Sequence, residues 1–159
     1  MLDEIKSGVD FVTDFLSRND IISQHKIQQF STALESLLHD KYNNHWFPTN
    51  PIQGSGYRCI RITQSIMDPE IEKAAKVSGV SNMDLTNTLP KEFTMWIDPD
   101  EVSYRIGEDG SICTLVNEQK CATPDIKDVS PSSSLIQRCQ SEVNKPDFID
   151  HPPFAQCWS

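Results

Sequence analysis

The sequence predicts a single α+β domain that is followed by a mobile tail. Three observations lead to this prediction: two successive helical patterns at the N-terminus, strand patterns with turn signals between residues 57 and 116, and a loss of periodicity beyond about residue 118. We expect an N-terminal helical hairpin and short helices packed on a small, mainly antiparallel sheet within residues 1–118. Residues 119–159 are expected to form a disordered C-terminal tail, because prolines and serines replace the periodic apolar pattern there.

Two amphipathic helices are predicted first along the chain. The apolar residues of the first helix recur every three or four positions and are Ile5, Val9, Val12 and Leu16. Asn19 and Asp20 interrupt this pattern, and Ser23 is suited to cap the next helix. The apolar residues of the second helix are Ile27, Phe30, Leu34, Leu37 and Leu38. A short break between two such helices favours an antiparallel hairpin with a shared apolar side.

A turn-rich segment and a first strand come next. Asparagines and prolines after residue 42 lead into the Gly54-Ser-Gly56 triplet, which is typical of a turn. Residues 57–62 then show a strand pattern, with Ile60 and Ile62 on one face.

Two short helices are predicted from their end signals. Asp68 before Pro69 is the pattern of an N-cap followed by a proline at the first helical position, and Gly79 is expected to end that helix. Ser81 can cap another short helix, which Pro90 cannot continue.

The last part of the predicted domain is an antiparallel meander. Its segments are a strand at 92–97, a proline turn at 98–100, a strand at 101–106, a hairpin loop at 107–110 and a strand at 111–116. In the second of these strands, the residues expected to face inward are Val102, Tyr104 and Ile106. Those expected to face outward are Glu101, Ser103 and Arg105.

One tryptophan is predicted to lie outside the core. Successive side chains of a strand point to opposite faces, so Trp96 shares a face with Glu92 and Thr94 if Phe93 and Met95 face the core. A large indole on a polar face is typical of a contact surface. We therefore predict that Trp96 contacts a protein partner.

Charge and cysteine usage restrict the class of protein. The net charge is −9, and residues 1–119 carry 10 basic and 18 acidic residues, which disfavours direct binding of nucleic acid by a basic face. Five cysteines without a CxxC pair favour reduced thiols, with Cys59 and Cys113 as small core residues in strands. The acidic N-terminal start and the lack of a long apolar run predict an intracellular protein without a signal peptide or membrane contact.

Signals for catalysis and for metal binding are weak. The Gly54-Ser-Gly56 triplet precedes a strand, whereas a phosphate-binding loop needs a helix directly behind its glycines, so a tight turn is favoured. Metal-ligand spacing is absent among His25, His39 and His45. A turn-cap role or a protein contact is favoured over acid–base chemistry for the clustered acids Asp98, Asp100 and Glu101. No catalytic residue, cofactor or metal site is predicted.

Three further motifs each have two interpretations. The LxxLL pattern from Leu34 to Leu38 matches helices that dock into receptor grooves, but burial is favoured because the same leucines form the amphipathic face. Ser130 before Pro131 is a candidate site for a proline-directed kinase, and a chance dipeptide is an equal alternative. The aromatic residues within 148–158 suggest a short docking motif, and the alternative is a disordered end.

Two stretches of the chain resemble the signature boxes of the BTG/Tob antiproliferative family. Residues 42–62 contain HWFP and GSGYRCIRI, and residues 89–113 contain LP, WIDP and EVSYRIGEDGSIC. The resemblance covers about residues 1–117 and rests on long, unusual motifs. It is nearer to the short BTG branch than to the long-tailed Tob branch, and it fades beyond Thr114.

This resemblance implies a non-enzymatic adaptor. Family members bind the Caf-type poly(A) nuclease subunit of the CCR–NOT deadenylase complex through the two boxes, and so promote mRNA deadenylation and decay and restrain cell proliferation. The residues implied to face the nuclease are Tyr57, Trp96, Asp98 and Glu101. The resemblance also implies a place in the cytoplasm and nucleus, with poly(A)-binding protein and transcription factors as further partners. The alternative is a nuclear transcriptional co-regulator that acts through its helices or tail independently of the nuclease.

Overall fold

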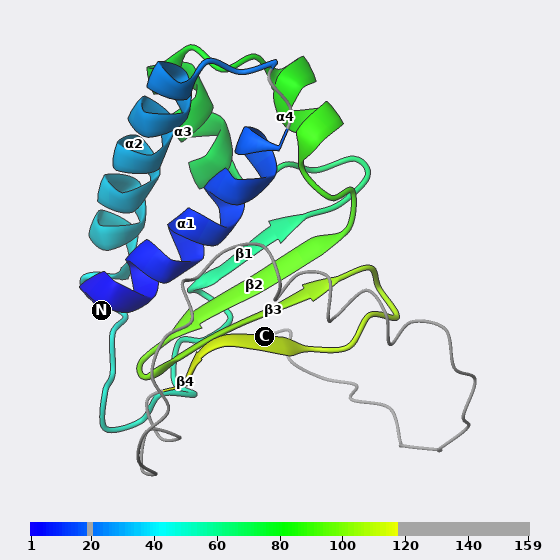
Figure 1. Ribbon diagram of the computed structural model, residues 1–159. Helices are drawn as coiled ribbons and strands as arrows, with labels where there is room; N and C mark the ends of the chain where they lie inside the picture. Colours follow the sequence, from blue (N-terminus) through cyan, green and yellow to red (C-terminus); the bar gives the residue numbers. More distant parts are fainter. Residues whose placement is uncertain (19–20, 118–159) are drawn as a thin grey trace, which may run out of the picture. The chain divides into compact units, whose positions relative to one another are not determined.

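The described part of the chain combines helices with one antiparallel sheet. The structure, a computed structural model, describes residues 1–18 and 21–117 (Figure 1). Its elements are α1 (Leu2–Ser17), α2 (Gln24–Tyr42), β1 (Cys59–Ile62), α3 (Pro69–Ser78), α4 (Asn82–Thr88), β2 (Phe93–Asp98), β3 (Glu101–Ile106) and β4 (Cys113–Asn117). Neighbouring strands pair antiparallel in the order β1-β2-β3-β4. The predicted α+β class is therefore confirmed.

Helix α1 packs on the sheet and α2 packs on both α1 and α3. The first two helices run in roughly opposite directions, as predicted (Figure 1). The four stripe residues of α1 are at most 2% exposed, and the Phe11 ring lies 4.3 Å from the Tyr104 ring of β3 between centroids. The buried apolar residues of α2 include Ile27, Phe30, Leu34 and Leu38, whereas Leu37 is only half-buried. Asn19 and Asp20, the predicted break, lie outside the described residues.

The caps of the short helices agree with the predicted end signals. The Asp68 carboxylate accepts a hydrogen bond from the Glu70 N–H at 2.9 Å, and Gly79 ends α3 with a left-handed φ of 68°. The Ser81 hydroxyl accepts from the Asp84 N–H at 3.1 Å and so caps α4. Ser23 occupies the N-cap position of α2, but its side chain makes no capping hydrogen bond.

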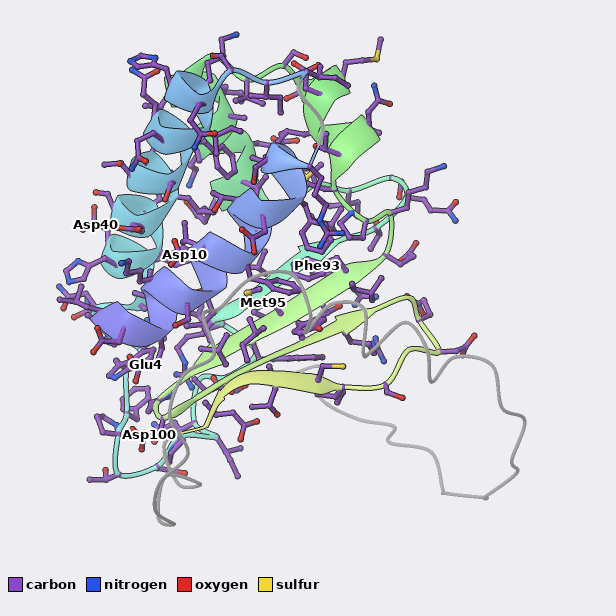
Figure 2. The ribbon with its side chains drawn as sticks, in the orientation of Figure 1. Glu4, Asp10, Asp40, Phe93, Met95 and Asp100 are labelled. Carbon is purple, nitrogen blue, oxygen red and sulfur yellow. The ribbon has the colours of Figure 1, made fainter. Side chains whose placement is uncertain are left out.

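Alternation along β2 places the core as predicted. Phe93, Met95 and Ile97 are at most 2% exposed, and Figure 2 shows Phe93 and Met95 beneath α1. The opposite face is less exposed than expected, since Thr94 and Ser103 are each 8% exposed. Thr94 lies between two arginines, Arg61 and Arg105, in the strand register, and long neighbouring side chains shield a short one.

Strand ends differ from the sequence-based boundaries. Asp98 belongs to β2 and pairs with Glu101, so the turn contains only Pro99 and Asp100. Asp100 has a φ of 67°, a left-handed conformation that aspartate tolerates better than most residues. Ile106, predicted to face inward, is 37% exposed because it is the last residue of β3. Likewise, β1 begins at Cys59 rather than at residue 57, and β4 begins at Cys113.

Gly8 sets how closely α1 approaches β2. A Cβ atom on Gly8 would lie 2.7 Å from Ile97 Cδ1 and 3.1 Å from Met95 Sδ. We therefore expect Gly8→Leu to lower the free energy of unfolding in urea by roughly 1–3 kcal/mol through overpacking. Gly56→Leu is the matched control, since a Cβ there meets nothing within 4 Å. Equal stability of the two variants would contradict close packing at Gly8.

Candidate functional site

Strand pairing brings the two signature stretches to one end of the sheet. Cys59 of β1 pairs with Trp96 of β2. Tyr57 lies two residues before Cys59 and Asp98 two residues after Trp96, so antiparallel pairing carries both to the same end. Glu101 is at that end too, because it pairs with Asp98 across the β2–β3 turn. The four residues that the family resemblance selects thus come from neighbouring backbone positions.

A buried arginine that the sequence analysis did not single out organises this end of the sheet. Arg58 has 0% exposure, yet every side-chain nitrogen donates a hydrogen bond. Nε donates to the Ile97 carbonyl at 3.1 Å and to Asp98 Oδ1 at 3.0 Å. Nη2 donates to Asp98 Oδ1 at 2.7 Å and to the Pro51 carbonyl at 2.6 Å, and Nη1 donates to the carbonyls of His45 and Gln53. Complete pairing makes burial of this charge tolerable.

Asp98 is committed largely to contacts within the domain. Its Oδ1 accepts from Arg58, and its Oδ2 accepts from the Ser55 hydroxyl at 2.6 Å. Only 21% of its side chain is exposed. Asp98 therefore holds the turn-rich segment to β2, and a partner can reach no more than that exposed fraction.

Tyr57 is presented at the surface by a stacked histidine. The Tyr57 ring lies 3.8 Å from the His45 ring between centroids, with an interplanar angle of 19°, and Lys41 Nζ is 5.6 Å from the Tyr57 ring centroid. Tyr57 nevertheless remains 46% exposed. Stacking fixes the ring orientation, so little side-chain freedom remains to be lost on binding.

Half-buried Trp46 and fully buried Tyr42 also contact Arg58. The Arg58 guanidinium lies 5.5 Å from the Trp46 ring centroid, a cation–π contact that ties the turn-rich segment to the buried arginine. The Tyr42 hydroxyl is buried and donates to the Arg58 carbonyl at 2.8 Å. Burial raises the pKa of Tyr42, so its hydroxyl stays protonated as a donor.

Trp96 lies on the sheet face away from α1 and is half-buried. Its neighbours in the register are Cys59 on β1 and Ser103 on β3.

The two strand cysteines, Cys59 and Cys113, are half-buried and not core residues, which corrects the prediction made for them. Burial, together with the Asp68 carboxylate, raises the pKa of the Cys59 thiol to about 11, so this thiol is neutral at neutral pH and is a poor nucleophile.

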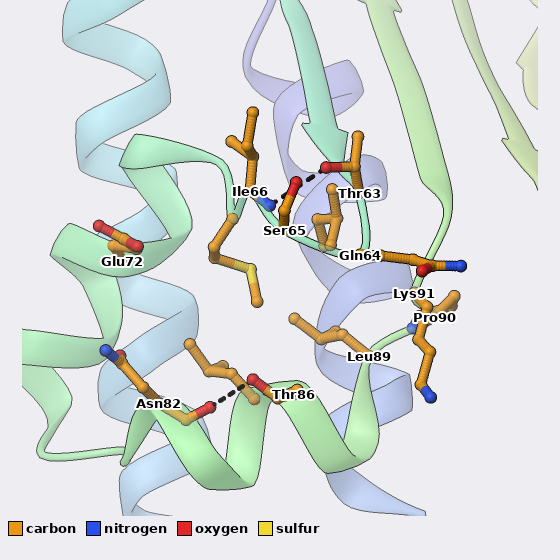
Figure 3. Close-up of a pocket in the computed structure, with 13 residues that line it drawn as sticks. Thr63, Gln64, Ser65, Ile66, Glu72, Asn82, Thr86, Leu89, Pro90 and Lys91 are labelled. Carbon is orange, nitrogen blue, oxygen red and sulfur yellow. Dashed lines mark hydrogen bonds between the residues drawn. The ribbon is translucent and has the colours of Figure 1, made fainter.

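Two concave regions lie in different parts of the domain. A shallow cleft of about 210 Å³ adjoins the site and is lined by Pro51, Ile52, Ser55, Asp98, Pro99, Asp100 and Glu101. A larger pocket of about 380 Å³ lies between the loop after β1 and α4 (Figure 3). Apolar residues such as Met67 and Leu89 line it together with Glu72 and Lys91. In the smaller cleft the Ser55 hydroxyl donates to Asp98 Oδ2, and Arg58 holds the same carboxylate, so this contact joins the turn-rich segment to β2.

The weaker sequence motifs have structural explanations. Gly54 has a φ of 80°, and a Cβ there would lie 2.9 Å from Arg58 Nη1, which confirms the tight-turn interpretation. Leu34 and Leu38 of the LxxLL pattern are fully buried, which confirms their core role.

Within residues 1–18 and 21–117, no group of three or more histidine, cysteine or acidic side chains is placed to hold a metal ion. None of the helices in these ranges is long and apolar enough to cross a membrane.

Several predictions concern segments outside the described residues. They are the candidate phosphorylation site Ser130, the aromatic docking motif at 148–158, and the disordered tail at 119–159. Each stays a prediction from the sequence, as does the domain boundary near residue 118.

Comparisons with known proteins identify relatives across nearly the whole chain. A family model described as "BTG family" matches residues 1–116. The chain is 51% identical over 123 residues to Protein BTG2 of Rattus norvegicus, with 77% of each chain covered. It is 51% identical over 144 residues to Protein BTG1 of Rattus norvegicus, with 91% of this chain and 81% of the relative covered. Protein Tob2 of Homo sapiens is 38% identical over 160 residues, with 96% of this chain but 46% of the relative covered.

A solved structure has the same fold. A variant of the BTG/Tob domain of C. elegans FOG-3 matches with a TM-score of 0.67 and 23% identity, covering 74% of this chain and 90% of that chain. At this level of identity the likeness concerns the fold alone.

Arg58 is the residue whose loss should damage the site most. We expect Arg58→Met to lower the free energy of unfolding in urea by about 3–5 kcal/mol, because Asp98 and three loop carbonyls lose their donor. Arg61→Met is the matched control: its side chain is 58% exposed and pairs with Glu108 at 3.3 Å, an interaction worth at most about 1 kcal/mol. A loss no larger for Arg58→Met than for Arg61→Met would contradict the role assigned to this arginine.

Glu4 links α1 to the β2–β3 turn and should make stability depend on pH. Its buried carboxylate accepts from the Asp100 N–H at 3.3 Å and pairs with the Met1 ammonium (Figure 2). Burial alone raises the pKa of Glu4, but the ammonium and the N–H groups of Glu4 and Asp100 outweigh burial, so the pKa lies below its usual value of 4.5.

A lowered pKa in the folded state means that ionised Glu4 stabilises the fold above its unfolded pKa, and that this contribution is lost as the pH falls. Glu4→Gln should therefore lower the free energy of unfolding at about pH 7 and much less at about pH 3. The exposed neighbour Asp3 supplies the control variant Asp3→Asn. A Glu4→Gln effect that is equal at both pH values would rule out this ionic contribution.

Proposed function

Since the chain belongs to the BTG family, we propose that it is a non-enzymatic adaptor that binds the poly(A) nuclease subunit of the CCR–NOT deadenylase complex. Binding would promote mRNA deadenylation and decay and restrain cell proliferation. The higher identity to BTG1 and BTG2 than to Tob2 confirms the resemblance to the short branch. For the proposed activity, we expect the protein in the cytoplasm and the nucleus.

The convergence of the two signature stretches carries this proposal. Tyr57 from one stretch and Trp96 with Glu101 from the other meet at one end of the sheet, through the β1–β2 pairing and the β2–β3 turn. Tyr57 is 46% exposed although it is aromatic, and Trp96 is half-buried on the face away from α1. Accessible aromatic side chains on a rigid sheet are the usual anchors of a protein interface.

Charge at this end of the sheet favours a basic partner surface. Asp100 and Glu101 line the cleft beside the site, and Glu101 is exposed. Lysine or arginine side chains on the nuclease would complement them, which affects orientation and association rate more than affinity. Asp98 contributes chiefly by fixing the segment that precedes Tyr57.

A second function, transcriptional co-regulation, is supported only through the tail. Burial of Leu34 and Leu38 removes the helix pattern that suggested docking into a receptor groove. The aromatic residues within 148–158 still suggest a docking motif. Poly(A)-binding protein and transcription factors are proposed as further partners on the same family grounds.

Trp96→Ala is the direct test of the adaptor surface. We expect calorimetric titration with the purified nuclease subunit to show binding that is roughly 30- to 1000-fold weaker, a cost of about 2–4 kcal/mol. Val77→Ala is the control, since Val77 is 72% exposed on α3 and away from the signature stretches. Circular dichroism establishes that both variants are folded. An unchanged affinity of folded Trp96→Ala would remove Trp96 from the interface.

Deleting residues 120–159 separates the two functions. The adaptor proposal predicts that the truncated chain binds the nuclease within about threefold of the full chain. Loss of repression in a reporter assay with nuclease binding intact would assign a separate function to the tail. Loss of nuclease binding would show that the docking surface extends beyond residue 119.

A further inference from the structure

We propose that Ile52 is the apolar anchor of the docking surface and enters an apolar pocket with a basic border on the nuclease. The inference rests on the proposed function and adds a residue that lies outside the set implied by the family resemblance. Ile52 is 86% exposed, the largest exposure among the large apolar side chains of the described residues. Single exposed apolar residues are common, so exposure alone does not define a contact site.

The backbone around Ile52 is held from both sides. Arg58 Nη2 donates to the Pro51 carbonyl at 2.6 Å, and Nη1 donates to the Gln53 carbonyl at 2.9 Å. The Ile52 carbonyl itself accepts from the Ser55 N–H at 3.2 Å. The buried guanidinium thus fixes the peptide groups that flank the exposed side chain. A side chain presented on a fixed backbone binds with little further loss of conformational freedom.

Ile52 also stands within the acidic end of the sheet. It lines the 210 Å³ cleft together with Asp98, Asp100 and Glu101. An apolar group with acidic neighbours is complementary to an apolar pocket that lysine or arginine borders. The same basic partner surface suits Glu101, so Ile52 would extend one continuous interface.

Ile66 supplies a matched comparison at the opposite end of the sheet. It is 64% exposed and follows the C-terminal end of β1, and it lines the larger pocket, whose charged residues are one acid, Glu72, and one base, Lys91 (Figure 3). Its loop is also fixed, since the Ile66 N–H donates to the Thr63 hydroxyl at 3.1 Å. Ile52 and Ile66 therefore share residue type and exposure but differ in their distance along the sheet from the proposed site.

The test is calorimetric titration of the nuclease subunit with four full-length chains: wild type, Ile52→Ser, Ile52→Leu and Ile66→Ser. We expect Ile52→Ser to bind about 10-fold or more weakly, the effect of losing one buried aliphatic side chain. Ile52→Leu keeps the apolar volume and should stay within about threefold of wild type. Ile66→Ser should stay within about twofold.

The outcomes distinguish this inference from the proposed function. Wild-type binding with equal affinity for Ile52→Ser would overturn the anchor role and leave the adaptor function standing. Equal weakening by Ile52→Ser and Ile66→Ser would also overturn it, because the effect would not depend on the site. No binding by the wild-type chain would overturn the adaptor function and the anchor role together.

Discussion

One buried cation, Arg58, fixes the end of the sheet where the proposed site lies. The Arg58 side chain is removed from water, and one carboxylate together with four backbone carbonyls accepts its hydrogen bonds. Burial of an unpaired charge would cost several kcal/mol, so residues 45–53 must adopt the conformation that delivers their carbonyls to the guanidinium. A turn-rich segment without a core of its own thereby acquires a single conformation.

This constraint links the stability of the fold to the shape of the proposed docking surface. The Arg58–Asp98 pair joins the turn-rich segment to β2, while Glu4 holds the following turn from α1. Tyr57, Trp96 and Glu101 depend on these contacts for their relative positions. A fully paired polar network defines one geometry, and a partner then binds it with less reordering.

The features that could be predicted from the sequence are those set by residues close together in the chain. The stripe of α1, the Asp68 cap of α3 and the two faces of β2 follow from spacing within a few residues. The role of Arg58 has no such signal, because its partner Asp98 is 40 residues away and its other acceptors are backbone carbonyls. Family resemblance selects Tyr57 and Trp96, but the exposure of Ile52 follows only from the loop conformation that Arg58 imposes.

Hydrogen–deuterium exchange, measured with and without the nuclease subunit, tests the central claim most directly. If the end of the sheet around Arg58 is the docking surface, exchange should slow in residues 50–57 and 98–101 when the nuclease is added. Exchange in residues 63–67 and 82–91, around the larger pocket, should stay the same. Protection confined to the larger pocket or to the helices, with 50–57 unchanged, would contradict the account.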